Sequence, residues 1–334
     1  MRKIIDDQKL IYRCCRMYYE ERMEQQKIAD ALSVSRATVS KLLNAGRDLG
    51  IVTITVNRPD GASAYSLEER MMDLFPLKEV VIVEDSPLNR RDKFVEDISA
   101  RAMHLIRRYI REKDVVGVSM GKTLYDVCHS REKDFEPVDC TFVPLVGGLS
   151  SGTQISENFN SNRIAADMAG AFDGEYVEFF SPALFSDRTV LEGFMREAPI
   201  KRIFQYYRRM NTVIMGIGIP NRGGSSMVKA GYIRPEELDE MVERGMVGDL
   251  SLQFFDEYGN EEPFYDFNKR VAGMPLSQIL QVENRITVVM RGVSQARALY
   301  AAIRGGYTNI VVLDQKCASR LIAWREEELN SSKG

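Results

Sequence analysis

Residues 24–43 read EQQKIADALSVSRATVSKLL, and this stretch predicts two short helices joined by a tight turn. Ile28, Ala29 and Leu32 recur at helical spacing and give the first helix an apolar face. Ser35 is a good N-cap for the second helix, because its hydroxyl can accept a backbone N–H from the first turn. The small side chain of Ala29 lets the two helices cross closely, as a helix-turn-helix requires.

The charge of this segment suits a polyanion. Residues 1–50 contain 10 Lys and Arg against 7 Asp and Glu, which gives them a net charge of +3. The whole chain has a net charge of −3, so residues 51–334 carry −6. A basic helix face favours phosphate, and the second helix of such a pair enters the DNA major groove. The alternative is an amphipathic helical hairpin with a solvated basic face. The predicted DNA contacts are Gln25, Gln26, Ser35, Arg36, Thr38 and Lys41.

The flanking segments extend this first domain. Before it, Asp6 or Asp7 can cap a packing helix, and after it residues 52–56 alternate apolar and polar side chains, which predicts a strand that forms a wing. The following NRPDGASAYS is rich in Pro, Gly and small polar residues, as linkers are. We therefore expect a helix-turn-helix domain over residues 1–56, a linker over 57–65 and a second domain over 66–330.

The second domain alternates helices and strands. Ser66 and Glu69 form a capping box that opens a helix. Beyond it, short β-rich runs predict strands at 80–83, 115–118, 141–146, 213–217, 286–290 and 310–313. Such alternation predicts a Rossmann-like α/β domain, a mostly parallel sheet with helices on both faces. Ligands of these sheets bind at the carboxyl ends of the strands, so the residues after each run are the candidates for a site.

Two of these strand ends are rich in glycine. GVSMGKTL at 117–124 offers Ser119, Gly121, Lys122 and Thr123 at a helix start, where free N–H groups suit an anionic or hydroxyl-rich ligand. A tight strand-to-helix turn explains the same residues, and the stretch is no Walker A loop because the required glycine is missing. VPLVGGLS at 143–150 carries paired glycines that permit close backbone approach, and they add Gly147 and Gly148 to the candidates.

Three further features complete the candidate site. Gly216 and Gly218 lack the third glycine of a dinucleotide fingerprint, so we expect no nicotinamide cofactor. Arg291 and Gln295 lie at another predicted helix start. Asp249 could accept hydrogen bonds from sugar hydroxyls, although an ordinary capping role is the alternative.

Composition narrows the class of protein. Hydrophobic residues make up 44% and charged residues 28%, as in ordinary globular proteins, and no apolar run is long enough for a signal peptide or a membrane span. We therefore expect a cytoplasmic protein with no membrane contact. The five cysteines are odd in number and form no CxxC pair, so they predict buried, reduced thiols rather than disulfides or a zinc site, and we expect no metal and no cofactor.

Seven motifs in order make the chain resemble the SorC family of bacterial sugar-responsive transcriptional regulators, grouped with the deoxyribonucleoside regulators. They are QQKIADALSVSRATVSKLL, DVVGVSMGKTL, FVPLVGGLS, VIMGIGIP, GMVGDLSLQFFDEYGN, RVAGMPLSQIL and ALYAAIRGGYTNIVVLD. The resemblance covers nearly the whole chain. It implies an effector domain similar to the sugar-phosphate isomerase and deaminase fold, assembly into homodimers or homotetramers, operator DNA as a partner, and a sugar, sugar alcohol or phosphosugar as the effector.

The resemblance also implies which residues contact the effector. They are Lys122, Thr123, Gly147, Gly148, Asp249 and Gln295. Relatives carry a basic residue where this chain has Val146 and a lysine where it has Gln295, and losing both charges weakens a phosphate site. Arg291 and Lys122 could restore positive charge. Two hypotheses follow, an unphosphorylated polyol or a phosphosugar gripped by Arg291 and Lys122.

The alternative class is an enzyme, a sugar-phosphate isomerase or deaminase, because that fold is shared with such enzymes and fold does not settle function. Against catalysis, the chain has only two histidines, His104 in a predicted amphipathic helix and His129 near a helix end. Lys122 lacks any sequence sign of the desolvated setting that a Schiff base needs. We therefore predict a regulator and no catalytic residues.

Overall fold

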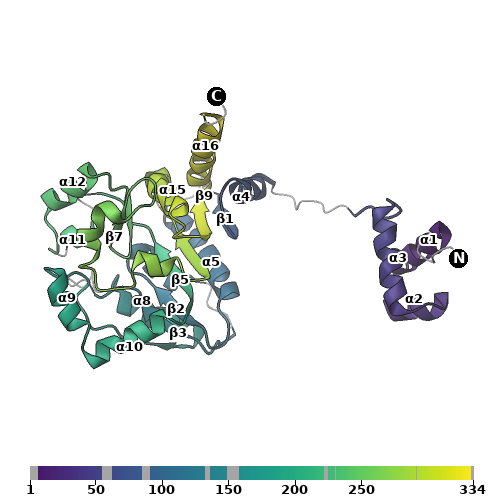
Figure 1. Cartoon of the computed structure of the whole chain (residues 1–334), viewed down its shortest axis with the longest axis horizontal. Coiled ribbons are helices and arrows are strands. Elements are labelled where there is room, and N and C mark those ends of the chain that lie inside the picture. The colour runs from purple at the N-terminus through teal and green to yellow at the C-terminus, as the bar shows by residue number, and fades with distance from the viewer. Residues whose placement is uncertain are drawn as a thin grey trace. The chain divides into compact units, whose positions relative to one another are not determined.

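The computed structural model divides the chain into two compact units, Met1–Asp60 and Gly61–Gly334, and each is described here by itself (Figure 1). The described residues are 7–54, 62–84, 91–131, 136–148, 158–221, 225–229, 231–290 and 292–331. No helix in these ranges is long and apolar enough to cross a membrane.

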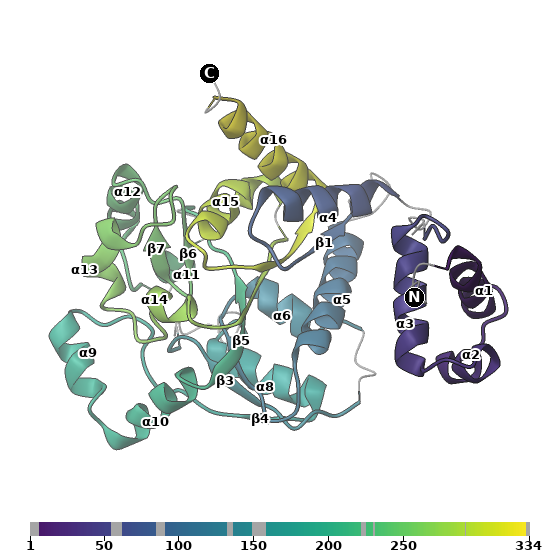
Figure 2. The same cartoon turned by 45° about the vertical axis from the view of Figure 1, so that its right-hand side comes forward.

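The first unit consists of three helices, α1 (Gln8–Tyr19), α2 (Gln25–Leu32) and α3 (Arg36–Asp48) (Figure 2). Asp7 caps α1 by accepting the N–H groups of Lys9 and Leu10. Nine side chains from the three helices form one buried core: Ile11, Cys14, Cys15, Met17, Ile28, Ala29, Val39, Leu42 and Leu43. The predicted helix pair and its capping are confirmed.

The turn between α2 and α3 has the geometry that the sequence predicted. Ser33 adopts a left-handed conformation (φ 52°) and ends α2, and its N–H bonds back to the carbonyls of Ala29 and Asp30. The Ser35 hydroxyl accepts the N–H of Thr38 at 3.1 Å and begins α3. A further close approach joins α1 to α3, where a Cβ on Gly46 would lie 2.3 Å from the Cys15 sulfur.

The predicted strand at 52–56 is not found in residues 51–54, which form a bend and irregular chain; Thr55 and Val56 lie outside the described residues. The reason is packing. Ile51 and Val52 both pack against the three-helix core instead of alternating between two faces, and the N–H of Val52 bonds to the carbonyl of Gly46. Ile54 is left exposed.

The second unit is built on a seven-stranded sheet with the order β1-β9-β8-β5-β2-β3-β4, and every neighbouring pair is parallel. All six predicted strands are present. The strands are β1 (Glu79–Val83), β2 (Val115–Val118), β3 (Thr141–Pro144), β4 (Glu175–Tyr176), β5 (Met210–Gly216), β8 (Asn284–Val288) and β9 (Ile310–Asp314). Strand β4 was not predicted, because two residues are too few to show the alternation of apolar and polar side chains that marks a strand.

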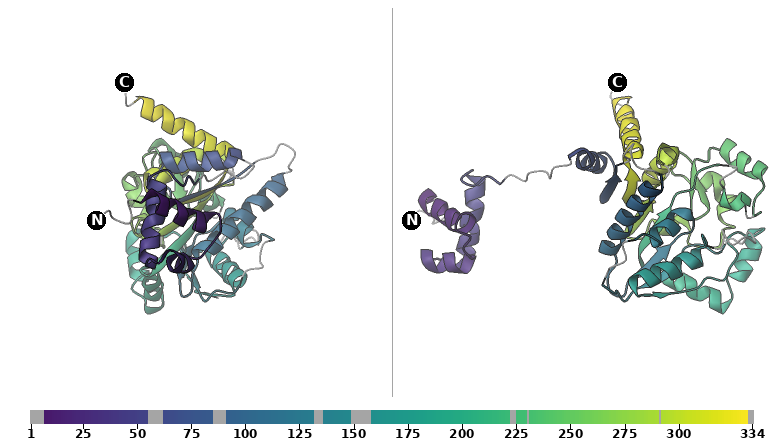
Figure 3. Two further views of the ribbon diagram at one scale, coloured as in Figure 1. Left: turned by 90° about the vertical axis from the view of Figure 1, so that its right-hand side faces the viewer. Right: turned by 180° about the vertical axis from the view of Figure 1, so that it is seen from behind.

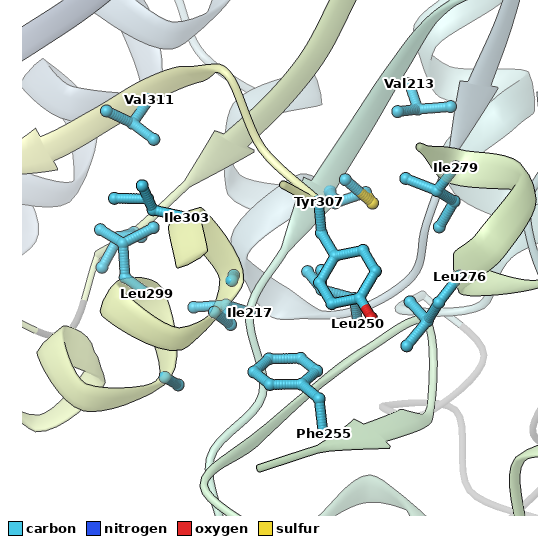
Figure 4. Close-up of a cluster of buried hydrophobic side chains, with 14 of the residues drawn as sticks. Val213, Ile217, Leu250, Phe255, Leu276, Ile279, Leu299, Ile303, Tyr307 and Val311 are labelled. Carbon is cyan, nitrogen blue, oxygen red and sulfur yellow. The ribbon is translucent and has the colours of Figure 1, made fainter. Parts of the chain in front are cut away.

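Helices cover both faces of this sheet, as predicted (Figure 2; Figure 3). One face packs against α5 (Arg91–Tyr109), α6 (Lys122–Cys128) and α8 (Ser161–Phe172). The other face carries the largest core, part of which Figure 4 shows around Tyr307 and Phe255. The helices that contribute to it include α4 (Ala62–Leu74), α10 (Ala198–Tyr207), α14 (Leu276–Ile279), α15 (Ala296–Arg304) and α16 (Gln315–Ser331).

The predicted capping box at Ser66 and Glu69 was wrong. Helix α4 begins at Ala62, so both residues lie inside the helix and not at its start. Alanine is the strongest helix former, and Ala62 and Ala64 extend the helix by a turn at its N-terminus. Glu68, one residue before Glu69, accepts the N–H of Ile82 at 2.8 Å and so ties α4 to β1.

A third, smaller core belongs to an antiparallel hairpin, β6 (Gly248–Leu250) and β7 (Gln253–Phe255), and to the helices around it. These helices are α11 (Ser226–Lys229), α12 (Pro235–Glu243) and α13 (Tyr265–Asn268). A short antiparallel bridge between Gly218 and Asp249 joins the hairpin to the segment that follows β5. The hairpin therefore lies at the carboxyl end of the sheet, close to where β5 ends.

The five cysteines are free and buried, as expected. Desolvation raises the pKa of the Cys14 thiol and of the Cys140 thiol to about 11 each, so both stay protonated at neutral pH. These thiols contribute to packing.

Candidate ligand pocket and DNA-binding surface

A pocket opens between the carboxyl ends of β2 and β5, which are neighbours in the sheet. From β2 the chain continues into α6 on one face, whereas the elements after β5 lead to α15 on the other. Such a switch point is where open α/β sheets bind ligands. About 870 Å³ inside the pocket is free of protein atoms, part of it open to solvent.

Three segments far apart in the sequence form the pocket wall. The predicted residues Ser119, Gly121, Lys122 and Thr123 follow β2, Gly216 ends β5 and is followed by residues 217–219, and the β6–β7 hairpin closes the third side. The remaining lining residues described are Met120, Asn221, Ser225, Met227, Leu238, Met246, Asp249, Ser251, Leu252 and Gln295. Six of the nine predicted effector contacts are thus brought together.

Asp249 is held against the end of β5 by its backbone and its side chain. Gly218 and Asp249 exchange two backbone hydrogen bonds, at 2.9 and 3.2 Å. The Asp249 carboxylate accepts the N–H of Leu252 at 3.2 Å. Burial raises the pKa of Asp249 to about 6, although the Leu252 N–H opposes this shift. The carboxylate fits so closely that a Cβ on Gly218 would lie 1.9 Å from its Oδ1 atom.

The turn that presents Asp249 is strained. Ser251 (φ 49°) and Leu252 (φ 68°), the two residues of the turn, both have left-handed backbone conformations without being glycine. Such conformations cost about 1–3 kcal/mol each and persist where the surrounding structure holds them. One tie is the Ser251 hydroxyl, which donates to the buried Ser119 hydroxyl at 2.9 Å across the pocket wall. Strain of this kind clusters at functional sites.

Lys122 and Gln295 already make contacts within the protein. The ammonium of Lys122 donates to both carboxylate oxygens of Asp126, each at 2.8 Å. The buried Gln295 amide donates from Nε2 to the carbonyl of Ile217 at 2.6 Å. Helix α6, which begins at Lys122, has no side-chain N-cap bond. Its first N–H groups are therefore open to partners other than a capping side chain.

Gly147 and Gly148 are placed differently from the prediction, outside the described pocket lining. Their N–H groups bond to the carbonyls of Ala272 and Ser181, and a Cβ on Gly147 would lie 2.6 Å from the carbonyl of Ser181. Backbone packing thus accounts for Gly147, whereas a Cβ on Gly148 would lie 2.6 Å from the side-chain Nδ2 of Asn160. Arg291 lies outside the described residues.

Most of the pocket residues that the β6–β7 hairpin contributes were not predicted from the sequence. Ser251 and Leu252 carried no signal beyond their place in a short polar interruption between apolar residues. Because β6 and β7 have only three residues each, the alternation that marks a strand is too short to detect.

In the first unit, α3 presents an exposed face that includes Arg36 and Lys41. Ala37, Ser40 and Asn44 share this exposed face, at a spacing of three or four from Arg36 or Lys41, and of these Ala37 and Asn44 were not predicted. Thr38 is half-buried, and its hydroxyl lies 2.9 Å from that of Ser35, so both residues serve the helix cap.

At the start of α2, Gln25 is half-buried and Gln26 is exposed. The Gln26 amide donates to the carboxylate of Asp30 at 3.1 Å. The two histidines, His104 and His129, are exposed and do not line the pocket.

Comparison with known proteins gives the family. The Sugar-bind family, described as "Putative sugar-binding domain", matches residues 61–323. The sorbitol operon regulator of Klebsiella pneumoniae is 27% identical over 323 residues, which cover 95% of this chain and 98% of the relative. The deoxyribonucleoside regulator of Bacillus subtilis is 28% identical over 321 residues, with the same coverage of 95% and 98%.

Solved structures show the same fold. The full-length SorC regulator of K. pneumoniae superposes with a TM-score of 0.69 at 24% identity, over 95% of this chain and 99% of that chain. A transcriptional regulator from Streptococcus pneumoniae superposes with a TM-score of 0.71 at 17% identity, over 79% and 98%. The chain belongs to the Sugar-bind family and is a sugar-responsive transcriptional regulator of the SorC type.

Proposed function

We propose that the pocket between β2, β5 and the β6–β7 hairpin binds a small polyhydroxy effector, and that this binding sets the affinity of the first unit for operator DNA. One observation carries the proposal: the Asp249 carboxylate, the Ser119–Ser251 hydroxyl pair and the uncapped start of α6 converge at the switch point of the sheet. A carboxylate accepts hydrogen bonds from sugar hydroxyls, serine hydroxyls both donate and accept, and helix N–H groups donate to oxygen atoms of a ligand.

Two chemistries of effector fit this pocket. Asp249 and the two serines suit a neutral sugar alcohol, whereas the start of α6 also suits a phosphate group. Thermal-shift screening of sugar alcohols against their phosphate esters decides between them, repeated on Arg291→Ala and Asp249→Asn. We expect Asp249→Asn to weaken every effector. A phosphate preference that Arg291→Ala removes would assign the phosphate to Arg291, and stabilisation by no hydroxyl compound would contradict the proposal.

For the DNA-binding unit we propose that Arg36 and Lys41 contact the operator, with Gln25 and Gln26 beside the backbone. The Arg36→Ala and Lys41→Ala variants should weaken operator binding, and a lost phosphate contact also lowers the salt dependence. Effector binding should stay intact in both variants. Lys9→Ala on α1 is the matched control, since it removes an exposed basic side chain that is not on the α3 face. Loss of effector binding in Arg36→Ala would contradict two separable sites.

We further propose that the chain is not an enzyme and acts as a homodimer or homotetramer held together by the second unit. The domain limits that we propose are 1–56 for DNA binding, 57–61 for the linker and 62–330 for the effector domain; the sequence predicted a linker up to residue 65, but α4 begins at Ala62. The relatives compared above are named as regulators, which supports a binding role. Turnover of a sugar phosphate by the purified chain would contradict it. Sedimentation of the full chain measures the oligomer, and a monomer at operator-binding concentrations would contradict the assembly.

A further inference from the structure

The charge of the pocket depends on a residue that does not line it. Among the described lining residues, Lys122 and Asp249 are the ones with ionisable side chains. Lys122 is the cation of the two, and its ammonium lies 2.8 Å from both carboxylate oxygens of Asp126, one helical turn further along α6. The positive charge at the pocket mouth is therefore matched by a negative charge outside the lining.

We propose that Asp126 determines the selectivity of the pocket between neutral and phosphorylated effectors by holding Lys122. The inference rests on the proposed function, because it takes the pocket to be the effector site. Asp126 acts through Lys122 and is a positioning residue. It holds the ammonium in one place and adds a negative charge that a phosphate dianion would feel, whereas a neutral polyol would not.

The burial of Asp126 distinguishes its contact with Lys122 from an ordinary ion pair on the protein surface. The Asp126 side chain is only 16% exposed, whereas that of Lys122 is 59% exposed. Solvent therefore screens the carboxylate less than an ordinary surface charge. The ammonium is at the end of a flexible stem and can turn to another anion once its partner is removed.

The chain provides a matched control on helix α8. In α8, Arg163 and Asp167 form a basic–acidic pair with the same spacing of four, at 2.9 Å, with side chains 57% and 15% exposed. Neither residue lines the pocket. Asp167→Asn therefore removes a carboxylate of the same burial from a pair with the same spacing, and it controls for the change in overall charge; the Asp167 carboxylate also lies 3.8 Å from Nε2 of His129 at the end of α6.

The test measures dissociation constants of the full chain for D-glucitol and for D-glucitol 6-phosphate, with inorganic phosphate as a third probe. Asp126→Asn should shift the ratio of the first two constants toward the phosphate ester by about fivefold or more, because one opposing charge is gone and one cation is freed. Inorganic phosphate should bind more tightly by a similar factor. Lys122→Gln combined with Asp126→Asn should abolish most of this gain, and Asp167→Asn should leave the ratio unchanged.

Three results would overturn the inference. They are an unchanged ratio in Asp126→Asn, an equal shift in Asp167→Asn, or a full gain that persists in the double variant. Failure of the proposed function looks different, because it would appear in the wild-type chain as the absence of binding by every hydroxyl compound in the screen, phosphorylated or not.

Discussion

The two functional regions of this molecule are built in opposite ways. The proposed DNA contacts come from α2 and α3, two helices adjacent in sequence, and the core beneath them comes from residues 11–43. The pocket joins Ser119 to Ser251, residues 132 positions apart, and needs three segments to form its wall. A local structure is fixed by caps and turns in its own sequence, whereas a pocket of this kind depends on close contacts between distant segments. Single substitutions should therefore affect the two regions to very different extents.

The largest expected effect comes from Gly218→Ala in the pocket. Its Cβ would lie 1.9 Å from Oδ1 of Asp249, so the carboxylate has to move away. Loss of a hydrogen bond to a charged group costs roughly 1.5–3 kcal/mol, and we expect effector affinity measured by calorimetry to fall about 10- to 100-fold. Operator binding without effector should be unchanged.

Gly170→Ala is the control for this substitution. Gly170 lies in α8, and a Cβ there would meet no atom within 4 Å. An alanine in a helix interior is favourable, so this variant should bind effector as the wild-type chain does. If Gly218→Ala bound effector as tightly as the wild-type chain, the position of the Asp249 carboxylate would not affect binding. The contrast between a region fixed by local contacts and one fixed by distant contacts would then lose its main support.

A smaller effect should appear when the pH is lowered. Burial raises the pKa of Asp249 from 3.8 to about 6, so the native protein holds this proton more tightly than the unfolded chain does. The contribution of Asp249 to stability therefore increases as pH falls from about 6 to 4. Binding has the opposite sign if the ionised carboxylate is the acceptor: effector affinity should fall roughly tenfold between pH 7 and pH 5.

The variant Asp249→Asn is the reference for this titration. Its effector affinity, measured by calorimetry across the same range, should be weak and should not depend on pH. The described lining residues of the pocket all belong to the second unit, so the salt dependence of operator binding provides a second reference. A wild-type affinity that stays constant from pH 7 to pH 5 would exclude the ionised Asp249 as the acceptor.

The smallest effect concerns Ser35, the N-cap of α3. Ser35→Ala removes the acceptor for the N–H of Thr38 and should cost about 1 kcal/mol. We expect amide hydrogen exchange in α3 to speed up about fivefold, with no change in the strands of the sheet. Ser35→Asp should restore protection, since Asp caps as well as Ser, yet weaken operator binding by placing a carboxylate beside phosphate. Wild-type protection of the α3 amides in Ser35→Ala would contradict the conclusion that the cap within its own sequence stabilises this helix.

The same contrast explains what could be predicted from the sequence. The caps at Asp7 and Ser35 and the six strands of the sheet follow from local patterns, and the structure confirms them. The predicted strand after α3 was wrong because Ile51 and Val52 both turn to the core, a tertiary preference that alternation in sequence does not report.

The pocket was predictable only in part. Ser119, Lys122, Asp249 and Gln295 were found because strand ends and family motifs mark them. The tie between Ser119 and Ser251 has no sequence signal, since it depends on how a three-residue strand is placed against the sheet. Gly147 lies outside the described lining, where a Cβ would lie 2.6 Å from the carbonyl of Ser181, and in sequence a glycine needed for such packing resembles one needed for a ligand.

The position of β9 has a consequence for synthesis of the protein on the ribosome. β9 is formed by residues 310–314 but lies between β1 and β8, so β1 has no partner in the sheet until residues 310–314 have been synthesised. The helices of the first unit end at Asp48 and leave the exit tunnel long before. With domains folding in order as they emerge, each nascent chain passes through an interval in which it has a DNA-reading helix but no metabolite sensor.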